Sequence, residues 1–287
     1  MMNSKLTSNR KKKINLSYAS KLEHNIAQRF VIKAIELISG KKKLESIYEK
    51  YKSEDRKPIE FWSEILKVMG IKFINKSSLK ISIPQKGPLI IVSNHPFGII
   101  DGIILCSIVS EFRDNFRIMA HETLKILPEL ERFILPVEFK DESTKTKKNN
   151  VRTTLLARDH LLAGGLVIIF PAGGVSTAKN IRSEAIDADW KTFVAKLVHQ
   201  TKSDVLPIFF DGKNSMLFHF FSTKLKSQTL KYSSYLYETR KKMGKEIEIY
   251  FGKVINYQSM KNLNDRNKLT KYLKEATFSL KSKKYND

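Results

Sequence analysis

The sequence predicts an α/β fold: a mostly parallel central sheet flanked by helices and preceded by an N-terminal amphipathic helical segment. From about residue 71 onward, short apolar runs of strand length alternate with longer stretches of helical periodicity, which is typical of strands joined by covering helices. Residues 89–92 are apolar without a break, as in a strand covered on both faces. Before residue 70 the apolar residues follow the helical period.

Three segments are expected along the chain. Residues 1–22 are polar and basic, which predicts a flexible arm. Residues 23–70 predict amphipathic helices, with Gly40 and Gly70 as stop signals. Apolar side chains recur there at helical spacing over three stretches: 24–39, 44–51 and 61–69. Residues 71–287 form the α/β domain that follows.

Strands and helices are expected in alternation within this domain. Strands are expected where apolar and polar residues alternate, over 79–83, and at six apolar runs: 89–92, 117–119, 134–137, 166–170, 205–210 and 246–251. Helices are expected over five stretches: 101–112, 150–163, 190–201, 229–243 and 266–282. The Lys-rich residues 140–149 predict a charged, flexible insert.

The charge of the chain predicts an anionic partner. Lysine and arginine number 52 against 29 acidic residues, giving a formal net charge of +23, which favours nucleic acid, an anionic lipid surface or an acidic protein. The basic residues are spread along the chain, and no zinc spacing, helix-turn-helix or RNA-binding aromatic signature accompanies them. Binding to nucleic acid is therefore not expected.

Cysteine and histidine usage argues against disulfides and metal sites. The single cysteine, Cys106, lies in an apolar run and predicts a buried, inert thiol in a cytosol-facing protein. The six histidines are scattered, so no metal site is expected.

Apolar runs long enough for a membrane span are missing from the sequence. The basic N-terminus lacks the apolar stretch of a signal peptide, and no run approaches the ~20 residues of a spanning helix. The protein is therefore expected to lie on a membrane without crossing it, at the cytoplasmic, inner face of the cell membrane.

The first candidate site segment is residues 90–102, IIVSNHPFGIIDG. His95 directly follows the apolar strand, and Asp101 opens the next helix. Such a pair lets the carboxylate hold one ring nitrogen, so that the other can take a proton from a hydroxyl or amine. Gly98 would let the backbone approach a substrate closely. The alternative is a plain loop histidine with Asp101 as a helix cap.

Two further segments follow expected strands. Residues 166–177 end in Phe170 and Pro171, followed by Gly173 and Gly174. Paired glycines can point backbone N–H groups at an anion or oxyanion, or they can form an ordinary turn.

The third segment, residues 204–215, carries Pro207 inside an apolar strand pattern. A proline there predicts an edge strand or a bulge. Its apolar side chains could line a groove for an acyl chain, although Ile208 and Phe210 are expected to be ordinary core residues.

In this order and spacing, the segments resemble the glycerolipid (lysophospholipid) acyltransferase superfamily, which includes 1-acylglycerol-3-phosphate acyltransferases, and within it the hemolysin-like branch. The resemblance covers about residues 80–255. Four motif regions have counterparts: Asn94, His95 and Asp101 in the first, residues 117–137 in the second, 170–173 in the third and 205–208 in the fourth.

The resemblance implies acyl transfer from a thioester, acyl-CoA or acyl carrier protein, to a lysophospholipid-type hydroxyl, with no tightly bound cofactor. His95 would be the general base and Asp101 would orient it, while N–H groups near Gly173 and Gly174 would stabilise the oxyanion. The motif residues and the glycines together give the expected substrate-binding residues: Asn94, Gly98, Phe170, Pro171, Gly173, Gly174 and Pro207.

Departures from the family pattern leave the acceptor open. Five residues separate His95 from Asp101 where the family usually has four, and Ala172 and Val175 replace a usual Glu and a frequent Arg. An N-acyltransferase that makes an ornithine or glycine lipid remains an alternative, because the same base would deprotonate an amine. A non-catalytic protein that binds anionic lipid or nucleic acid is the other alternative.

Overall fold

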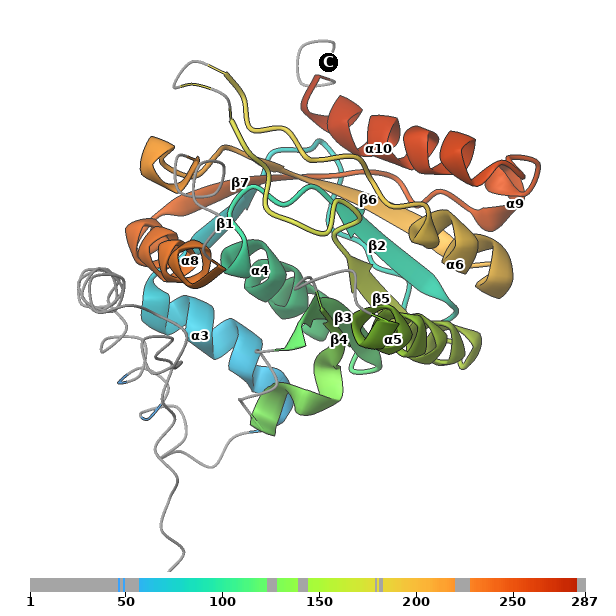
Figure 1. Cartoon of the computed structure of the whole chain (residues 1–287), viewed down its shortest axis with the longest axis horizontal. Coiled ribbons are helices and arrows are strands. Elements are labelled where there is room, and N and C mark those ends of the chain that lie inside the picture. The colour runs from blue at the N-terminus through green and yellow to red at the C-terminus, as the bar shows by residue number, and fades with distance from the viewer. Residues whose placement is uncertain are drawn as a thin grey trace, which may run out of the picture.

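A seven-stranded sheet forms the centre of the computed structural model, which describes residues 57–122, 128–138, 144–178, 180, 183–219 and 228–282 together with Ser46 and Glu49 (Figure 1). The strand order is β1-β7-β6-β2-β5-β3-β4. The strands are β1 (Lys72–Asn75), β2 (Leu89–Ser93), β3 (Phe116–His121), β4 (Ile134–Val137), β5 (Leu166–Ile169), β6 (Asp204–Asp211) and β7 (Glu246–Phe251). Neighbouring strands are parallel except for β6 and β7. The predicted α/β fold with a mostly parallel sheet is confirmed.

Helices cover both faces of this sheet. They are α3 (Phe61–Met69), α4 (Ile99–Ser110), α5 (Thr144–Leu162), α6 (Phe193–Thr201), α8 (Gln228–Lys242), α9 (Tyr257–Met260) and α10 (Arg266–Ser282), with 3-10 turns at Pro58–Glu60 and Pro128–Phe133. Figure 1 shows α3, α4 and α8 on one side and α5, α6 and α10 on the other. One cluster of buried apolar side chains lies under each layer. Among the described residues, no helix has both the length and the apolar character needed to cross a bilayer.

Strand β2 determines where a site can form. All five of its residues are buried, because β5 and β6 pair with it on either side and helices cover both faces. The unbroken apolar run predicted such a strand, and this prediction is confirmed. Since β2, β5 and β6 run parallel, their carboxyl ends meet at one edge of the sheet, where α/β proteins place their sites.

Helix α3 belongs to the same apolar core as the sheet. The Trp62 ring lies 6.4 Å from the Phe116 ring and 5.7 Å from the Phe133 ring. The helix ends at Gly70, whose φ of 64° is the left-handed conformation that glycine adopts without strain. The helix predicted over 61–69 is therefore confirmed.

Later elements mostly match their predicted bounds, and the α10 bounds are the same as predicted. The predicted arm (1–22) and helix (24–39) lie outside the described residues. Of the stretch 44–51 only Ser46 and Glu49 are described, and both are helical.

The strand predicted over 79–83 is wrong, and β1 lies earlier, at Lys72–Asn75. The alternation itself is real, since Ile83 is buried while Lys80 and Ser82 are exposed. However, β1 already pairs with β7 at this end of the sheet. Residues 79–83 therefore pack one side against the core without pairing with a strand.

The flexible insert predicted over 140–149 is also wrong in its second half, because α5 begins at Thr144. Glu138 anchors this start. Its N–H donates to Asn150 Oδ1 (3.0 Å), and Asn150 Nδ2 donates to its carbonyl (2.9 Å). These hydrogen bonds link the end of β4 to α5.

Pro207 does not mark an edge strand, because β6 lies between β2 and β7. The bulge expectation fits better. The pairs Ile208–Phe251 and Val205–Ile255 enclose residues 206–207 on one side and residues 252–254 on the other. The second segment is one residue longer, as in a bulge. A Cβ on Gly252 would lie 2.7 Å from the Pro207 ring, so the proline is accommodated by a glycine opposite it.

Candidate active site

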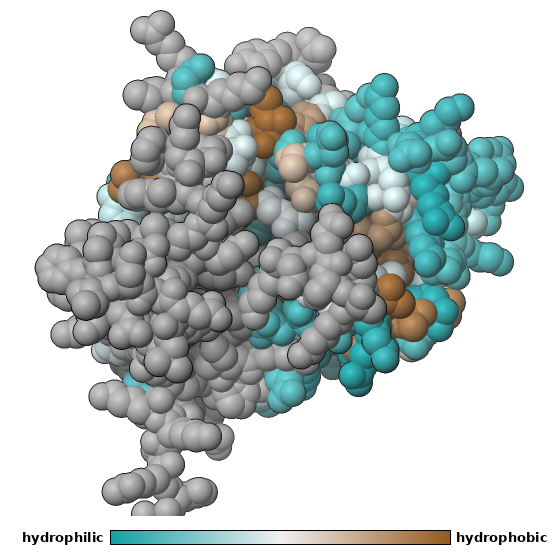
Figure 2. All heavy atoms as spheres, viewed as in Figure 1, coloured by the Kyte–Doolittle hydropathy of each residue, from teal (hydrophilic) through white to brown (hydrophobic). Residues whose placement is uncertain are grey.

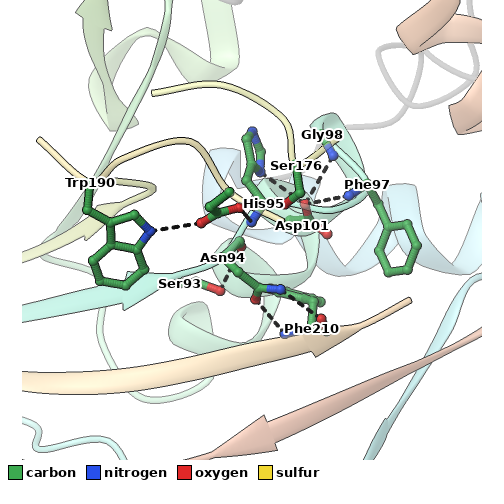
Figure 3. Close-up of polar contacts among 10 residues, drawn as sticks. Ser93, Asn94, His95, Phe97, Gly98, Asp101, Ser176, Trp190 and Phe210 are labelled. Atoms are coloured by element: carbon green, nitrogen blue, oxygen red, sulfur yellow. Dashed lines mark hydrogen bonds and ion pairs between the residues drawn. The ribbon is translucent and has the colours of Figure 1, made fainter. Parts of the chain in front are cut away.

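The turn after β2 begins with Asn94, whose buried side chain binds β6. Asn94 Nδ2 donates a hydrogen bond to the Phe210 carbonyl (2.9 Å), and Asn94 Oδ1 accepts one from the Phe210 N–H (2.8 Å). Figure 3 shows the Asn94 side chain reaching Phe210. Asn94 thereby fixes the point where the chain leaves the sheet, and with it the position of His95.

His95 and Asp101 form the pair that the sequence predicts. His95 Nδ1 lies 3.0 Å from Asp101 Oδ2, and the same oxygen accepts the N–H groups of Phe97 (2.9 Å) and Gly98 (3.0 Å). These two N–H groups lie at the start of α4. Asp101 therefore caps the helix and holds the imidazole at the same time. With Nδ1 donating to the carboxylate, Nε2 carries the lone pair that accepts a proton.

Burial controls the electrostatics of this pair. The Asp101 side chain is completely buried, whereas His95 is 18% exposed. Burial raises the pKa of Asp101, against the opposing effects of His95 and the two backbone N–H groups. Among the described residues, Asp101 Oδ1 has no hydrogen-bond partner. The carboxylate thus hydrogen-bonds one titrating side chain, the imidazole, while His95 remains open to a substrate.

The turn after β5 lies against His95. The Phe170 ring stacks on the imidazole with centroids 3.9 Å apart and an interplanar angle of 20°. Pro171 is buried, and its carbonyl accepts the Lys191 N–H (2.9 Å). The sheet therefore brings the first and third motif regions into direct contact.

The two glycines of this turn differ. Gly173 has a φ of 70° and donates its N–H to the Phe170 carbonyl (3.0 Å), which closes the turn. Within the described ranges the Gly174 N–H has no acceptor, and a Cβ there would meet nothing within 4 Å. Of the two N–H groups, that of Gly174 is the one left available to an oxyanion.

The backbone of Gly98, which was expected to approach a substrate closely, lies close to side chains of the protein. Its φ is 71°, and a Cβ there would lie 3.3 Å from Val175 Cγ2 and 3.4 Å from Tyr235 Cδ1. Pro207 lies in β6 opposite Val92 of β2 and is buried in the sheet. Ile208 and Phe210 are fully buried core residues, as expected. Cys106, in α4, is also fully buried, and burial raises the pKa of its thiol well above the usual value.

Asp187 is a residue of the site that the sequence did not reveal. It is 5% exposed. Its Oδ1 accepts hydrogen bonds from the Ser176 hydroxyl and from the His95 N–H (3.3 Å), and its Oδ2 accepts the Trp190 Nε1–H (2.8 Å). The Ser176 N–H in turn donates to the His95 carbonyl (2.9 Å). The peptide of His95 is therefore held on both sides.

Thr177 and Ile186 form a short antiparallel bridge next to the residues that hold the His95 peptide. The N–H of Thr177 donates to the carbonyl of Ile186 (3.0 Å), and the reverse bond is 2.9 Å. Ser176 belongs to the glycine segment noted in the sequence. No sequence signal distinguishes Asp187 from Asp189, two residues later.

A cavity of about 290 Å³ adjoins Phe170. Its lining is mostly apolar and includes Met119, Val137, Ile169, Phe170, Ala172 and Phe193. Asn150 and Lys191 supply polar groups. Phe170 thus separates His95 from a space suited to an apolar chain. A larger cavity of about 450 Å³ between α10 and residues 189–192 touches no predicted site residue. Among the described residues, no cluster of His, Cys, Asp or Glu is suited to a metal ion.

A His–Asp pair at the carboxyl edge of a mostly parallel sheet, beside an apolar cavity, is an arrangement that could remove a proton from a hydroxyl or amine in a group-transfer reaction. A family profile described as "Acyltransferase" matches residues 24–285, so the chain belongs to this acyltransferase family. The predicted acyltransferase relationship is confirmed at this level. The narrower hemolysin-like assignment stays a prediction.

Two curated relatives carry the same name, lyso-glycine lipid O-acyltransferase. One, from Phocaeicola vulgatus, is 27% identical over 69% of this chain and 70% of the relative. The other, from Bacteroides thetaiotaomicron, is 27% identical over 79% of this chain and 82% of the relative. A crystal structure of the 1-acyl-sn-glycerophosphate acyltransferase PlsC from Thermotoga maritima is similar with a TM-score of 0.47 and 14% identity, over 91% of this chain and 99% of that one.

Proposed function

We propose that this protein transfers a fatty acyl group from a thioester donor to the hydroxyl group of a lyso-lipid at an anionic membrane surface. The observation that carries the proposal is the geometry of His95, whose Nδ1 lies 3.0 Å from the buried Asp101 carboxylate. Membership of the acyltransferase family supports acyl transfer. The apolar cavity beside Phe170 supports a lipid substrate.

In this mechanism His95 is the general base. Its Nε2 takes the proton of the acceptor hydroxyl as the oxygen attacks the thioester carbonyl carbon. Asp101 keeps Nδ1 protonated and stabilises the imidazolium that forms. In this proposal the Gly174 N–H, which has no acceptor among the described residues, stabilises the tetrahedral oxyanion. The C–S bond then breaks, the new C–O ester bond remains, and the imidazolium returns its proton to the leaving thiolate.

We propose a lyso-glycine lipid, or a lyso-lipid close to it, as the acceptor. Two relatives are named for that substrate. Ala172 lines the cavity where the glycerolipid family usually has Glu, which fits an acceptor whose head differs from glycerol phosphate. O-acylation is therefore favoured over the N-acylation that forms an ornithine or glycine lipid.

Acyl-CoA and acyl carrier protein are both proposed donors, and an anionic membrane is the proposed site of action. A formal net charge of +23 favours both an acidic carrier protein and an anionic leaflet. This charge fits a cytoplasmic protein held peripherally at the inner face of the cell membrane.

The test is an acyl-transfer assay with purified protein. Lyso-glycine lipid, lysophosphatidic acid and the amino acids glycine and ornithine are offered separately, each with acyl-CoA or acyl carrier protein, and products are identified by mass spectrometry. We expect a diacylated glycine lipid and its loss in His95→Ala. Product from an amino acid, but from neither lyso-lipid, would replace this proposal with N-acylation. Product formed equally well by His95→Ala would overturn the mechanism.

A further inference from the structure

Helix α5 presents apolar side chains to solvent along most of its length. Val151 is 60% exposed, Leu155 44% and Leu162 60%. These positions are four and seven residues apart, so they lie on one face of the helix. Leu156, 40% exposed, extends that face. In Figure 2 apolar surface lies among hydrophilic surface at the lower right, where Figure 1 places α5.

Basic side chains interrupt this face. Lys148 is exposed and lies three residues before Val151, and Arg158 lies between Leu155 and Leu162 on the same stripe. Arg152 is exposed beside Leu156. The sequence of α5 contains one acidic residue, Asp159, which binds the Arg158 guanidinium at 3.0 and 2.8 Å. The face is therefore apolar with a net positive rim.

The same helix reaches the candidate active site. Asn150 lines the cavity next to Phe170, and the next residue, Val151, begins the exposed apolar stripe. The opposite face of α5 packs in the core through Ala157 and Leu161, which are fully buried. Helix α5 therefore carries the cavity residue Asn150 on its core-facing side and the exposed stripe on its outer side.

We propose that the exposed face of α5 is the surface by which the protein docks on an anionic phospholipid membrane. We call it the α5 face; it comprises Lys148, Val151, Arg152, Leu155, Leu156, Arg158 and Leu162. Apolar side chains interspersed with long basic ones are the composition of helices that lie in the membrane interface, where the cations reach anionic head groups. This inference rests on the proposed function, because an enzyme that acylates a lyso-lipid meets its acceptor at a membrane.

A site-specific probe tests this docking in the full-length protein. The single native thiol, Cys106, is fully buried with a raised pKa, so an environment-sensitive fluorophore can be attached selectively at Leu155→Cys. Val68→Cys is the matched control, because Val68 is 46% exposed on α3, on the other side of the sheet. Vesicles of phosphatidylcholine, with and without phosphatidylglycerol, are then added.

We expect the fluorophore at position 155 to move to an apolar environment with anionic vesicles, to respond less with neutral ones, and to lose the response in high salt. The control fluorophore at position 68 should not change. A silent probe at 155, an equal response at both positions, or a response to acyl carrier protein in place of vesicles would each overturn the proposal.

A partition measurement supplies a second readout. The double variant Val151→Glu/Leu155→Glu should bind anionic vesicles about tenfold or more weakly, because two apolar contacts are lost and two negative charges face the lipid. Val68→Glu should bind like the wild type. Unchanged vesicle binding by the double variant would contradict docking through α5.

The two proposals can fail separately. If the probe at position 155 of the otherwise wild-type protein stays silent with anionic vesicles, while acyl transfer to a water-soluble short-chain acceptor is intact, the α5 face is overturned and the proposed function stands. If the probe responds on a protein that transfers no acyl group, the proposed function is overturned and docking through the α5 face stands.

Discussion

Two regions hold His95, and they do so in different ways. The turn between β2 and α4 holds its ring through Asp101, and the segment 176–190 holds its peptide through Asp187. Both carboxylates are buried and both accept three hydrogen bonds. The two carboxylates differ in the groups that donate these hydrogen bonds.

Asp101 faces a group that titrates, whereas Asp187 faces an indole, a hydroxyl and a backbone amide, which do not. A carboxylate beside an imidazole can stabilise the ring when it becomes protonated. A carboxylate bound to donors that keep their protons only fixes the positions of those donors. In the proposed mechanism the first region therefore serves proton transfer and the second serves positioning.

The largest effect is expected from His95→Ala. Removing a general base typically costs 10²–10⁴-fold in rate, so the variant should lose at least that factor in kcat. His199→Ala is the matched control, because His199 binds the Leu263 carbonyl in the α6 region, away from this pair. Circular dichroism should show the same fold in both. A folded His95→Ala protein with near wild-type kcat would remove the first region from the chemistry.

Asp101→Asn should separate activity from stability. We expect kcat to fall about 10²-fold, because an uncharged amide no longer stabilises the imidazolium. The Asn oxygen can still accept the N–H groups of Phe97 and Gly98, so the cap of α4 is kept.

The pKa of Asp101 sets the sign of the stability change. Because this pKa is raised above 3.8, the ionised carboxyl opposes folding at neutral pH, and wild-type stability from this group falls as pH rises through the folded pKa. Thermal unfolding of Asp101→Asn at pH 7 should therefore occur at the wild-type temperature or above. The difference in unfolding temperature between Asp101→Asn and the wild type should disappear as the pH falls below the pKa of Asp101 in the folded protein. A strong loss of stability at pH 7 would mean that the charge contributes to folding.

Asp187→Ala should lower activity by a smaller factor, about tenfold, through displacement of the His95 peptide. It should also destabilise the protein by about 1–3 kcal/mol, because buried donors lose their acceptor. Asp189→Ala is the matched control, since Asp189 is exposed and two residues away.

The pH dependence of kcat distinguishes a positioning role of Asp187 from a role in proton transfer. If Asp187 only positions His95, the acid limb of the profile keeps its midpoint in Asp187→Ala while the plateau drops. A shifted midpoint would show that Asp187 shares in the proton transfer.

The smallest effect is expected at Gly174. Ala fits there, because the site is open and the φ is not in the left-handed region, and a backbone N–H survives the substitution. Acyl transfer should change less than about twofold. Gly98→Ala is the contrasting variant, because its φ of 71° and the 3.3 Å contact with Val175 should cost about 1–3 kcal/mol in unfolding free energy. Equal losses in both variants would point to a steric role for Gly174.

The pattern of apolar residues predicted those helices and strands whose formation depends mainly on residues close together in the sequence. The unbroken apolar run gave β2, and amphipathic periodicity gave α10 with the same bounds as observed. His95 and Asp101 are six residues apart, so one turn and one helix start could be inferred to join them. Strand β1 was missed because it is a half-buried edge strand, formed through its pairing with β7.

Long-range contacts account for what the sequence did not reveal. Asp187 lies 92 residues from His95 along the chain, and its partners are common residue types without a spacing rule. The position of Pro207 inside the sheet depends on Gly252, whose missing side chain makes room for the proline ring. Neither relation is visible until the strands are assembled.

The Asn94 amide solves a geometrical conflict at the edge of the sheet. A catalytic turn must leave its strand sharply, yet a backbone that departs leaves its neighbour's N–H and carbonyl without partners. Asn94 offers Phe210 one donor and one acceptor, as the missing peptide group would have done. The side chain thus imitates one more rung of the β2–β6 ladder, so the main chain can turn away toward His95 without a break in the hydrogen bonding of β6.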